Sequence, residues 1–318
     1  MLDPNIGEGA QDLNRRFVSA EPFRHVVIEK FLEPQFCREL MNQFPSFDVK
    51  HALNEMGDVG RKAAVTDLKR IGPAYAQFDA TIRSRGFLDT MSRITGIPDL
   101  LYDPEYVGGG THENLNGQDL DTHVDFNYHP KRHWHRRLNL IVFLNEEWDE
   151  TWGGCLELVR DPWSGDAAQP TRIVVPSANR AVIFETNERS WHGFRRIQLP
   201  DSKQGISRRS LAIYLYTRER PAEEVAASHA TIYVQRQLPA HLAPGHTLSE
   251  DDIEDIGALI QRRDSHMRFL YEREREFSEA LENMRQSPSF KIGRALTWPA
   301  RALRKVAHAL VRAVFTMV

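Results

Sequence analysis

The segment THVDF contains the first pair of side chains that could perform chemistry. It places His123 and Asp125 two residues apart, in a run whose alternation is typical of a β-strand. Residues two apart on a strand point to the same face, so we expect an imidazole and a carboxylate side by side. A third partner follows the apolar run 181–184, where the sequence RSWHGF supplies His192.

Two histidines and one carboxylate bound to one face of a metal leave three coordination positions open. This arrangement suits non-haem Fe(II), which must hold a co-substrate and O2 together. Taken singly, His123 would more often be an ordinary hydrogen-bonded histidine, and Asp125 a turn cap. The distal His192 and the basic strand that follows it make a metal centre the favoured hypothesis.

The run SRRSLAIYLYT places a guanidinium and a hydroxyl on one face of a later strand. Arg208 and Ser210 have the same parity, whereas Arg209 has the opposite one. A buried guanidinium requires an anion, and its planar fork binds a carboxylate through two hydrogen bonds. We expect Arg208 and Ser210 to hold the distal carboxylate of 2-oxoglutarate, whose 2-oxo acid end would chelate iron. Arg209 is the alternative, and both arginines could also be surface charges of an edge strand.

The elements that must position these residues lie mostly between residues 101 and 217. Upstream of them, residues 23–32 predict a strand, and residues 34–44 and 72–95 predict amphipathic helices. The pattern favours an α+β fold with a mainly β core, namely a double-stranded β-helix (jelly roll) with supporting N-terminal helices. The prediction rests on seven short β-rich runs separated by Gly, Pro and Asn: DTHVDF, LNLIVFLN, GCLELVRD, TRIVVP, RAVIFET, GFRRIQL and RSLAIYLYT.

Glycines and histidines crowd the expected opening of the site. Gly108–Gly110 lack the lysine and helix of a phosphate-binding loop, so we expect a tight turn or a mobile lid there. Residues 111–116 are expected to line the opening. The remaining histidines of the region are interpreted as loop residues at its mouth: His112, His129, His133 and His135.

Residues 101–217 resemble the Fe(II)/2-oxoglutarate-dependent dioxygenases of the prolyl 4-hydroxylase-like branch. The stretches that carry the resemblance are GGGTHENLNGQDLDTHVDFNYHP, HRRLNLIVFLNEEWDETWGGCLEL, RAVIFETNERSWHGF and RRSLAIYLYT, with EPFRHVVIEKFLEPQFCRELMNQFP upstream. The resemblance implies that His123, Asp125 and His192 bind Fe(II) and that Arg208 binds 2-oxoglutarate. It also implies an O2-dependent hydroxylation that releases succinate and CO2.

The family pattern implicates one further residue, and the sequence departs from this pattern in two respects. The segment LNEEWDETWGGCLEL resembles the strand and turn that line the co-substrate pocket, which implicates Leu156. Relatives often have at the position of Phe143 a tyrosine that hydrogen-bonds the co-substrate, so Asn139, on the same face, is expected to replace it. The interval from His192 to Arg208 exceeds the usual one, and the insertion PDSKQGIS would account for this as a longer hairpin loop.

The composition of the chain excludes several classes of protein. The chain has 318 residues, of which 41% are hydrophobic and 27% charged, as is ordinary for a soluble globular protein. A net charge of -3, with no basic patch on the expected barrel, argues against a nucleic-acid partner. Two cysteines exclude a disulfide framework and suit a reducing cytoplasm. The N-terminal segment lacks a signal-peptide pattern, so we expect a cytoplasmic enzyme.

The chain is expected to divide into four segments: a flexible arm (1–20), the dioxygenase domain (21–220), a long helical extension (221–286) and a basic amphipathic tail (287–318). The long helix should begin at Ser249, with Asp252 completing a capping box. Its apolar residues follow a 3-4 repeat that Arg263 and Glu274 interrupt. Such a helix either packs along the domain, which is favoured, or forms a homodimer through residues 253–284.

The tail combines Lys and Arg with apolar residues such as Trp298. It predicts either peripheral contact of residues 290–318 with the inner face of a membrane, or a helix docked on the protein. Its sequence resembles tails of bacterial polysaccharide-associated enzymes, which favours a sugar, a lipid-linked glycan or another small molecule as substrate. The alternatives are a prolyl-type hydroxylase of peptides and a non-catalytic barrel that scaffolds a membrane-linked complex.

Overall fold

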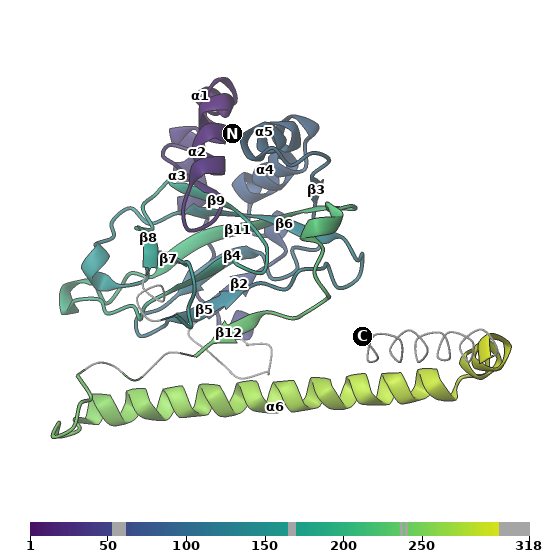
Figure 1. The fold of residues 1–318 in the computed structure, drawn as a ribbon. Helices are drawn as coiled ribbons and strands as arrows, with labels where there is room; N and C mark the ends of the chain where they lie inside the picture. The colour runs from purple at the N-terminus through teal and green to yellow at the C-terminus, as the bar shows by residue number, and fades with distance from the viewer. Residues whose placement is uncertain (53–61, 165–169, 236–237, 239–240, 299–318) are drawn as a thin grey trace, which may run out of the picture. The chain divides into compact units, whose positions relative to one another are not determined.

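The computed structural model describes residues 1–52, 62–164, 170–235, 238 and 241–298. The chain forms two compact units, Met1–Leu238 and Pro239–Val318. The first unit contains two β-sheets and a group of helices, and the second contains one long helix (Figure 1).

Two antiparallel sheets form the core of the first unit. The larger sheet runs in the order β1-β9-β6-β11-β4-β2, with β3 paired to β11, and the smaller runs β12-β5-β10-β7-β8. The strands are β1 (His25–Ile28), β2 (Lys62–Val65), β3 (Leu101–Tyr102), β4 (Gly110–Asn114), β5 (Leu120–Val124), β6 (His135–Phe143), β7 (Leu156–Val159), β8 (Pro170–Val174), β9 (Ala181–Glu185), β10 (Trp191–Phe194), β11 (Arg208–Thr217) and β12 (Ile232–Val234). This arrangement confirms the predicted double-stranded β-helix.

Alternation along the central strands divides the core between the two faces of the larger sheet. On β9, Val182 and Phe184 pack with Leu156 and Leu158 of the smaller sheet. Ile183, between them, belongs instead to the cluster that includes the helices. Because successive side chains point to opposite faces, a strand buried on both sides is mostly apolar, as residues 181–184 (AVIF) of β9 are.

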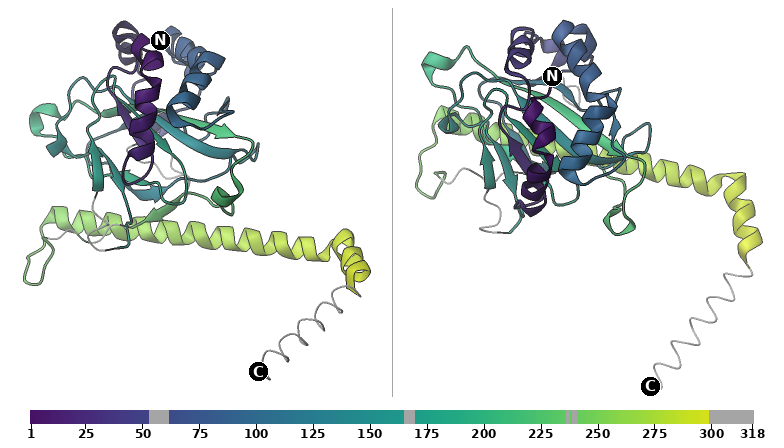
Figure 2. Two further views of the ribbon diagram at one scale, coloured as in Figure 1. Left: turned by 45° about the horizontal axis from the view of Figure 1, so that its top comes forward. Right: turned by 90° about the horizontal axis from the view of Figure 1, so that it is seen from above.

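Five helices cover the outer face of the larger sheet, as Figures 1 and 2 show. The helices are α1 (Pro4–Glu8), α2 (Ala10–Ser19), α3 (Pro34–Asn42), α4 (Pro73–Ile82) and α5 (Arg85–Thr95). The helix expected over 72–95 is therefore two helices. The second begins at Ser84, whose side chain accepts a hydrogen bond from the backbone of Phe87 and so caps a new helix.

The N-terminal segment is not a flexible arm, and that prediction is wrong. Residues 4–8 and 10–19 are helical, and Ile6, Leu13 and Phe17 are buried in the main core. Leu13 and Phe17 lie four residues apart, so they share one helix face. The polar residues between them occupy the opposite face, which is why the average composition concealed the helix.

The expected tight turn is present at Gly108, which has a φ of +75° and lies in a turn closed by a 2.9 Å hydrogen bond from the N–H of Gly109 to the carbonyl oxygen of Tyr106, whereas Gly109 and Gly110 serve strand pairing. Gly110 opens β4, which lies between β11 and β2 in the larger sheet. A Cβ at Gly110 would lie 2.2 Å from the carbonyl oxygen of Val65, and one at Gly109 would lie 2.7 Å from that of Ala212. The missing side chains therefore allow the two neighbouring strands to approach.

Other differences concern strand ends and loops. The run GFRRIQL is a strand only at its start, since β10 ends at Phe194. Strand β12 pairs with β5, so the first unit extends to Leu238, past the expected boundary at residue 220. His129 does not lie at an opening: its side chain is fully buried, with Nε2 3.2 Å from Asp103.

The second unit is dominated by α6 (Glu250–Gln286). The predicted capping box is confirmed, because Ser249 and Asp252 exchange side-chain and backbone hydrogen bonds. Ser287 ends the helix, and residues 288–298 are helical again. Residues 299–318, most of the predicted amphipathic tail, lie outside the described residues. Among the helices that the structure describes, none is long and apolar enough to cross a bilayer.

Candidate active site

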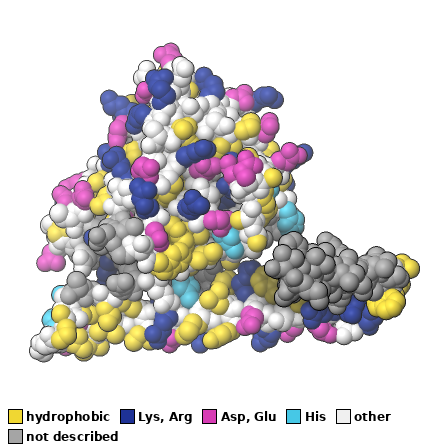
Figure 3. Space-filling model, viewed as in Figure 1, with side chains coloured by type: hydrophobic (Ala, Val, Ile, Leu, Met, Phe, Trp, Pro, Cys, Tyr) yellow, Lys and Arg dark blue, Asp and Glu magenta, His cyan; other side chains and the backbone are white. Residues whose placement is uncertain are grey.

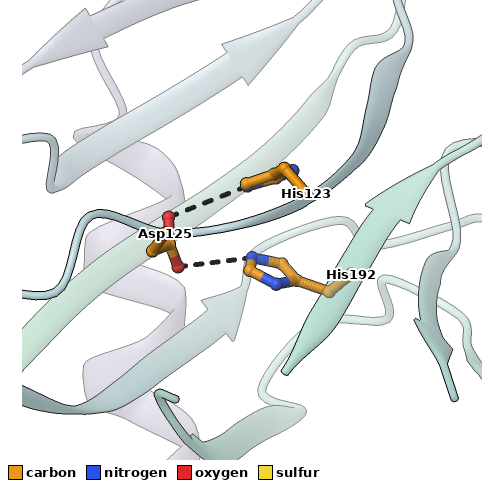
Figure 4. A group of neighbouring side chains, drawn as sticks. All are labelled: His123, Asp125 and His192. Carbon is orange, nitrogen blue, oxygen red and sulfur yellow. Dashed lines mark ion pairs between the residues drawn. The ribbon is translucent and has the colours of Figure 1, made fainter. Parts of the chain in front are cut away.

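Strands β5 and β10 bring together the histidines that the sequence singled out. They pair antiparallel with His123 directly opposite His192, and Asp125 follows the end of β5 (Figure 4). Nε2 of His123 lies 3.7 Å from Oδ1 of Asp125, and Nε2 of His192 lies 3.5 Å from Oδ2. Segments nearly 70 residues apart therefore converge on one point inside the barrel.

Backbone carbonyls orient both imidazoles. Nδ1 of His123 lies 2.8 Å from the carbonyl oxygen of Asp121, and Nδ1 of His192 lies 2.9 Å from that of Ser190. Each Nδ1 therefore donates its proton to the backbone, so the lone pair of Nε2 points toward Asp125. Burial lowers the pKa of His123 to about 3 and also lowers the pKa of His192. Both rings are thus neutral at pH 7, the form that binds metals.

The spacing of the three donors fits a metal ion better than a hydrogen-bonded cluster. Nitrogen–oxygen separations of 3.5 and 3.7 Å exceed hydrogen-bond length, yet all three ligand atoms lie within 4.8 Å of one another. Two ligand atoms at about 2.1 Å from one ion and at right angles would lie about 3 Å apart. The group therefore leaves the room that an ion of this size requires.

A second group of histidines and a carboxylate has a different geometry. His241 and His246 approach the two oxygens of Asp252 at 2.7 and 2.9 Å, which are hydrogen-bond distances. Oδ2 of Asp252 also accepts from the backbone and hydroxyl of Ser249. These contacts close the N-terminal cap of α6, so we assign this group no metal.

The two oxygens of Asp125 have different partners. Oδ2 accepts a hydrogen bond of 2.8 Å from Nδ2 of Asn139 and lies 3.1 Å from Nη2 of Arg136, which leaves Oδ1 facing His123. Burial alone would raise the pKa of Asp125, but the charge of Arg136, together with the hydrogen bond from Asn139, reverses this and lowers it. The carboxylate is thus ionised and held in one orientation.

Arg136 is a functional candidate that the sequence reasoning missed. Its side chain is 1% exposed, and both Nε and Nη2 donate to Oδ1 of Asn139. Its guanidinium also lies 3.5 Å from the centre of the Tyr214 ring. Asn139 is linked to both Arg136 and Asp125. Its contact with the co-substrate stays a prediction.

Arg208 lies on the inner face of the larger sheet and is 4% exposed. Nε donates a 2.6 Å hydrogen bond to the carbonyl oxygen of Gly154, and the rings of Phe143 and Phe194 flank the guanidinium. No carboxylate among the described residues forms an ion pair with it. Burial lowers the pKa of Arg208 to about 10, so it remains charged at pH 7. A buried cation of this kind requires an anion.

Arg209, the alternative anchor, is committed elsewhere. Its Nε lies 3.2 Å from a carboxylate oxygen of Glu113 and 3.1 Å from the hydroxyl of Ser207. Its side chain is also 38% exposed, against 4% for the whole of Arg208. The geometry therefore favours Arg208 as the residue that receives an anion.

The other predicted pocket residues lie near Arg208. Ser210 is buried and pairs with Phe143 across the β11–β6 ladder, and Leu156 packs in the same cluster as Phe143. Asn114, directly opposite Arg208 on β4, is also buried; it belongs to the stretch 111–116 that was expected to line the opening, but no contact with the co-substrate was predicted for it. Alternation along the segment GTHEN could have placed Asn114 on one face of the sheet, once that segment is known to be a strand.

Comparison with known proteins identifies the part of the chain that holds this site. Residues 110–216 match the model of the 2OG-Fe(II) oxygenase superfamily. They form a 2OG-Fe(II) oxygenase domain. The family predicted from the sequence is thereby confirmed for this segment, which contains the three converging residues and Arg208. The oxygenase domain makes the protein a 2-oxoglutarate-dependent dioxygenase that uses Fe(II), 2-oxoglutarate and O2.

Similar solved structures include members of the predicted branch. A prolyl-4-hydroxylase from Pseudomonas putida is 17% identical, with a TM-score of 0.43, covering 66% of this chain and 100% of its own. A prolyl 4-hydroxylase from Phytophthora capsici is 17% identical, with a TM-score of 0.44 and coverages of 91% and 89%. HygX from Streptomyces hygroscopicus, solved with nickel and 2-oxoglutarate, is 14% identical, with a TM-score of 0.41 and coverages of 65% and 91%. No curated protein sequence matches the chain significantly.

Proposed function

We propose that His123, Asp125 and His192 bind Fe(II), that Arg208 binds the distal carboxylate of 2-oxoglutarate, and that the enzyme hydroxylates a sugar, a lipid-linked glycan or another small molecule. The observation that carries the site assignment is the joint placement of a metal-sized gap and a buried cation that has no carboxylate partner in the part of the chain that the structure describes. Both lie in the segment that belongs to the oxygenase superfamily.

The residues around the gap determine how iron and co-substrate would be held. Nε2 of each histidine and Oδ1 of Asp125 are the donor atoms, while Arg136 and Asn139 hold Oδ2. When bound, iron supplies the activation of O2, with 2-oxoglutarate oxidised to succinate and CO2. The retained carboxylate of Asp125 supports hydroxylation, because halogenating relatives have a small residue at this position.

Arg208 and the two rings beside it act together in this arrangement. Its free guanidinium nitrogens would bind the distal carboxylate of 2-oxoglutarate, because the Nε contact to Gly154 fixes the fork. The flanking Phe143 and Phe194 exclude water from the ion pair, which strengthens it. Phe143 offers no hydroxyl, so Ser210 and the amide of Asn114 are the neighbouring groups that could complete carboxylate recognition.

Anaerobic titration with Fe(II) and 2-oxoglutarate tests the site assignment. We expect the weak visible charge-transfer band of the chelated co-substrate in the wild type and its loss in Asp125→Ala. Arg208→Gln should raise the KM for 2-oxoglutarate at least about 100-fold, because it removes a buried charge pair worth about 3 kcal/mol or more. The matched control is Arg209→Gln, which should leave the KM nearly unchanged. Equal effects of the two substitutions would exclude Arg208 as the specific anchor.

The substrate class requires its own experiment. The support for a sugar or lipid-linked substrate is the sequence of the tail, which resembles tails of polysaccharide-associated enzymes. Succinate release should rise above the uncoupled rate with glycans or sugar derivatives, and not with proline-containing peptides. Stimulation by peptides alone would favour the prolyl-type hydroxylase. Absence of both succinate release and the charge-transfer band would favour the non-catalytic scaffold.

We also propose that the enzyme is cytoplasmic and contacts the inner face of a membrane through residues 290–298 and the tail beyond them. Ile292, Leu296 and Trp298 are between 59% and 78% exposed, and Lys291 and Arg294 lie among them. A basic helix with exposed apolar residues binds anionic lipid surfaces. Co-sedimentation with anionic vesicles, lost on truncation after Ser287 and absent with neutral vesicles, would support this contact.

A further inference from the structure

The apolar residues of α6 form an exposed stripe along the whole helix. They occupy positions a and d of a heptad repeat and are Ile253, Ile256, Ile260, Met267, Leu270, Phe277, Leu281 and Met284. All except Ile256 are at least 40% exposed. In Figure 3, hydrophobic side chains alternate with charged ones along the surface that α6 forms. An exposed apolar stripe of this length marks an interaction surface.

Two charges interrupt the stripe, and their positions are informative. Arg263 occupies a d position and Glu274 an a position, and both side chains are exposed. They lie symmetrically about the middle of the helix, four residues outside Met267 and Leu270 respectively. In an antiparallel pair of helices, each a residue faces a d residue of the partner, so opposite charges in these positions can meet.

We propose that α6 forms an antiparallel coiled coil with α6 of a second copy of this chain. The two-fold axis passes between Met267 and Leu270, and Arg263 of each copy faces Glu274 of the other. This single register also pairs every apolar seam residue with an apolar partner: Met267 with Leu270, Ile260 with Phe277, Ile256 with Leu281 and Ile253 with Met284.

Other arrangements leave charges opposed or unpaired. In a parallel pair in register, Arg263 would face its own copy and so would Glu274, which places like charges in the seam twice. An antiparallel pair shifted by one heptad would set Arg263 against Met267 or Leu281. Burying an unpaired charge is strongly unfavourable, so the two charges select one orientation and one register.

Two pairs of residues that flank the seam agree with this register. In an antiparallel coil, e positions face e positions, and the proposed axis places Glu250 opposite Arg285 of the partner. It also places Leu259 opposite Ala280 at the g positions, which extends the apolar contact. In the parallel alternative, Glu250 and Arg285 would lie at opposite ends of the helix pair.

Charge reversal in the full-length protein tests the proposal without metal or substrate. Analytical ultracentrifugation should show a dimer for the wild type. Arg263→Glu or Glu274→Arg should raise the dimer dissociation constant about 100-fold, about tenfold for each of the two symmetry-related pairs. The combined variant R263E/E274R should restore dimerisation, because each introduced charge again meets its opposite. Arg268→Glu and Glu272→Arg are matched controls at outward positions and should leave the dimer intact.

Distance measurement separates the two orientations. Spin labels at Glu254→Cys would lie about 44 Å apart in the antiparallel register, from a rise of about 1.5 Å per residue, and within about 20 Å in a parallel pair. The native cysteines, Cys37 and Cys155, are buried and can be replaced if they label. A monomeric wild type, a short label distance, or failure of the double charge swap to restore the dimer would overturn the proposal. None of these outcomes bears on the oxygenase site.

Discussion

The two oxygens of one carboxylate show how single residues prepare this site. Asn139 and Arg136 both contact Oδ2 of Asp125, so Oδ1 is left for the metal ion that we propose. The histidines are prepared in the same way, because carbonyl oxygens occupy Nδ1 and leave Nε2. Partners of this kind fix the orientation of metal ligands before the metal arrives.

Arg136→Met should weaken iron binding without touching a ligand atom. The substitution removes the cation nearest to Oδ2 of Asp125, so the pKa of this carboxyl should rise and its orientation should loosen. We expect the Fe(II) dissociation constant, measured by anaerobic titration, to rise about 10- to 100-fold. Arg132→Met, at a more exposed residue outside this network, is the control. An unchanged affinity in Arg136→Met would show that Asn139 alone holds the carboxylate.

The convergence of the three proposed metal ligands could be predicted from the sequence, whereas the residues that support them could not. His123 and Asp125 share a face because of their spacing, and His192 follows a clear apolar strand. The supporting role of Arg136 has no such signal, because simple alternation from Asn139 points Arg136 to the outer face. Asn139 itself was placed on the correct face, but its partner depends on where Arg136 lies.

At the scale of elements, an irregularity in β6 explains the position of Arg136. The β6–β11 ladder pairs Leu138 with Leu215 and Arg136 with Tyr216, so Arg137 is skipped. A bulge of this kind redirects the side chains beyond it and is common beside active sites. Arg136 thereby joins the face of Asn139, while Arg137 pairs with Glu185 and Glu224. A one-residue insertion in pairing leaves no mark in hydrophobic alternation.

The turn before β7 determines the position of Arg208, so Gly154→Ala should impair co-substrate binding. Gly154 has a φ of +67°, and an added Cβ would lie 2.9 Å from Trp148 and 3.3 Å from Cδ of Arg208. We expect the KM for 2-oxoglutarate to rise more than kcat falls. The free energy of unfolding should fall by about 1–2 kcal/mol from the left-handed backbone alone.

Gly205→Ala is the control for this substitution, because an added Cβ there meets no atom within 4 Å and the backbone is not left-handed. Steady-state kinetics and chemical denaturation of both variants provide the comparison. If Gly154→Ala lowered stability but left the KM for 2-oxoglutarate unchanged, the turn would serve folding and not the position of Arg208.

Helix α2 provides a test of the N-terminal correction. Phe17 is completely buried, whereas its neighbour Val18 is 52% exposed. Phe17→Ala should lower the free energy of unfolding by about 3–5 kcal/mol, the usual cost of emptying a buried aromatic site. Val18→Ala should change it by less than about 0.5 kcal/mol. If both substitutions had small and equal effects in urea denaturation, the prediction of a flexible N-terminal arm would be supported after all.

At the scale of the whole molecule, buried histidines couple stability to pH. Burial lowers the pKa values of five histidines, His25, His112, His123, His135 and His192, so each stays neutral in the folded state at pH values where it is protonated in the unfolded state. His229 has the opposite sign, because its hydrogen bond with Glu188 raises its pKa. Five histidines with lowered pKa values against one with a raised value predict that acid favours unfolding. The sequence alone could not give this sign, because it depends on which histidines are buried.

The metal-free protein should therefore lose stability as the pH falls below about 6.5, the ordinary value for histidine. Above that value neither state binds a proton at the histidines whose pKa is lowered and their effect vanishes, and below it the unfolded state binds more protons. The slope should approach about 1.4 kcal/mol per pH unit for each neutral buried histidine and, for His123, continue down to about pH 3. Chemical denaturation in the presence of a chelator, in steps of about half a pH unit from pH 7.5 to 5, would measure this dependence of the free energy of unfolding on pH. His133→Gln, at an exposed position, is the control and should leave the curve unchanged. His25→Gln should reduce the slope of the curve. A flat curve in the wild type would mean that the site histidines are already protonated or solvated in the folded, metal-free enzyme.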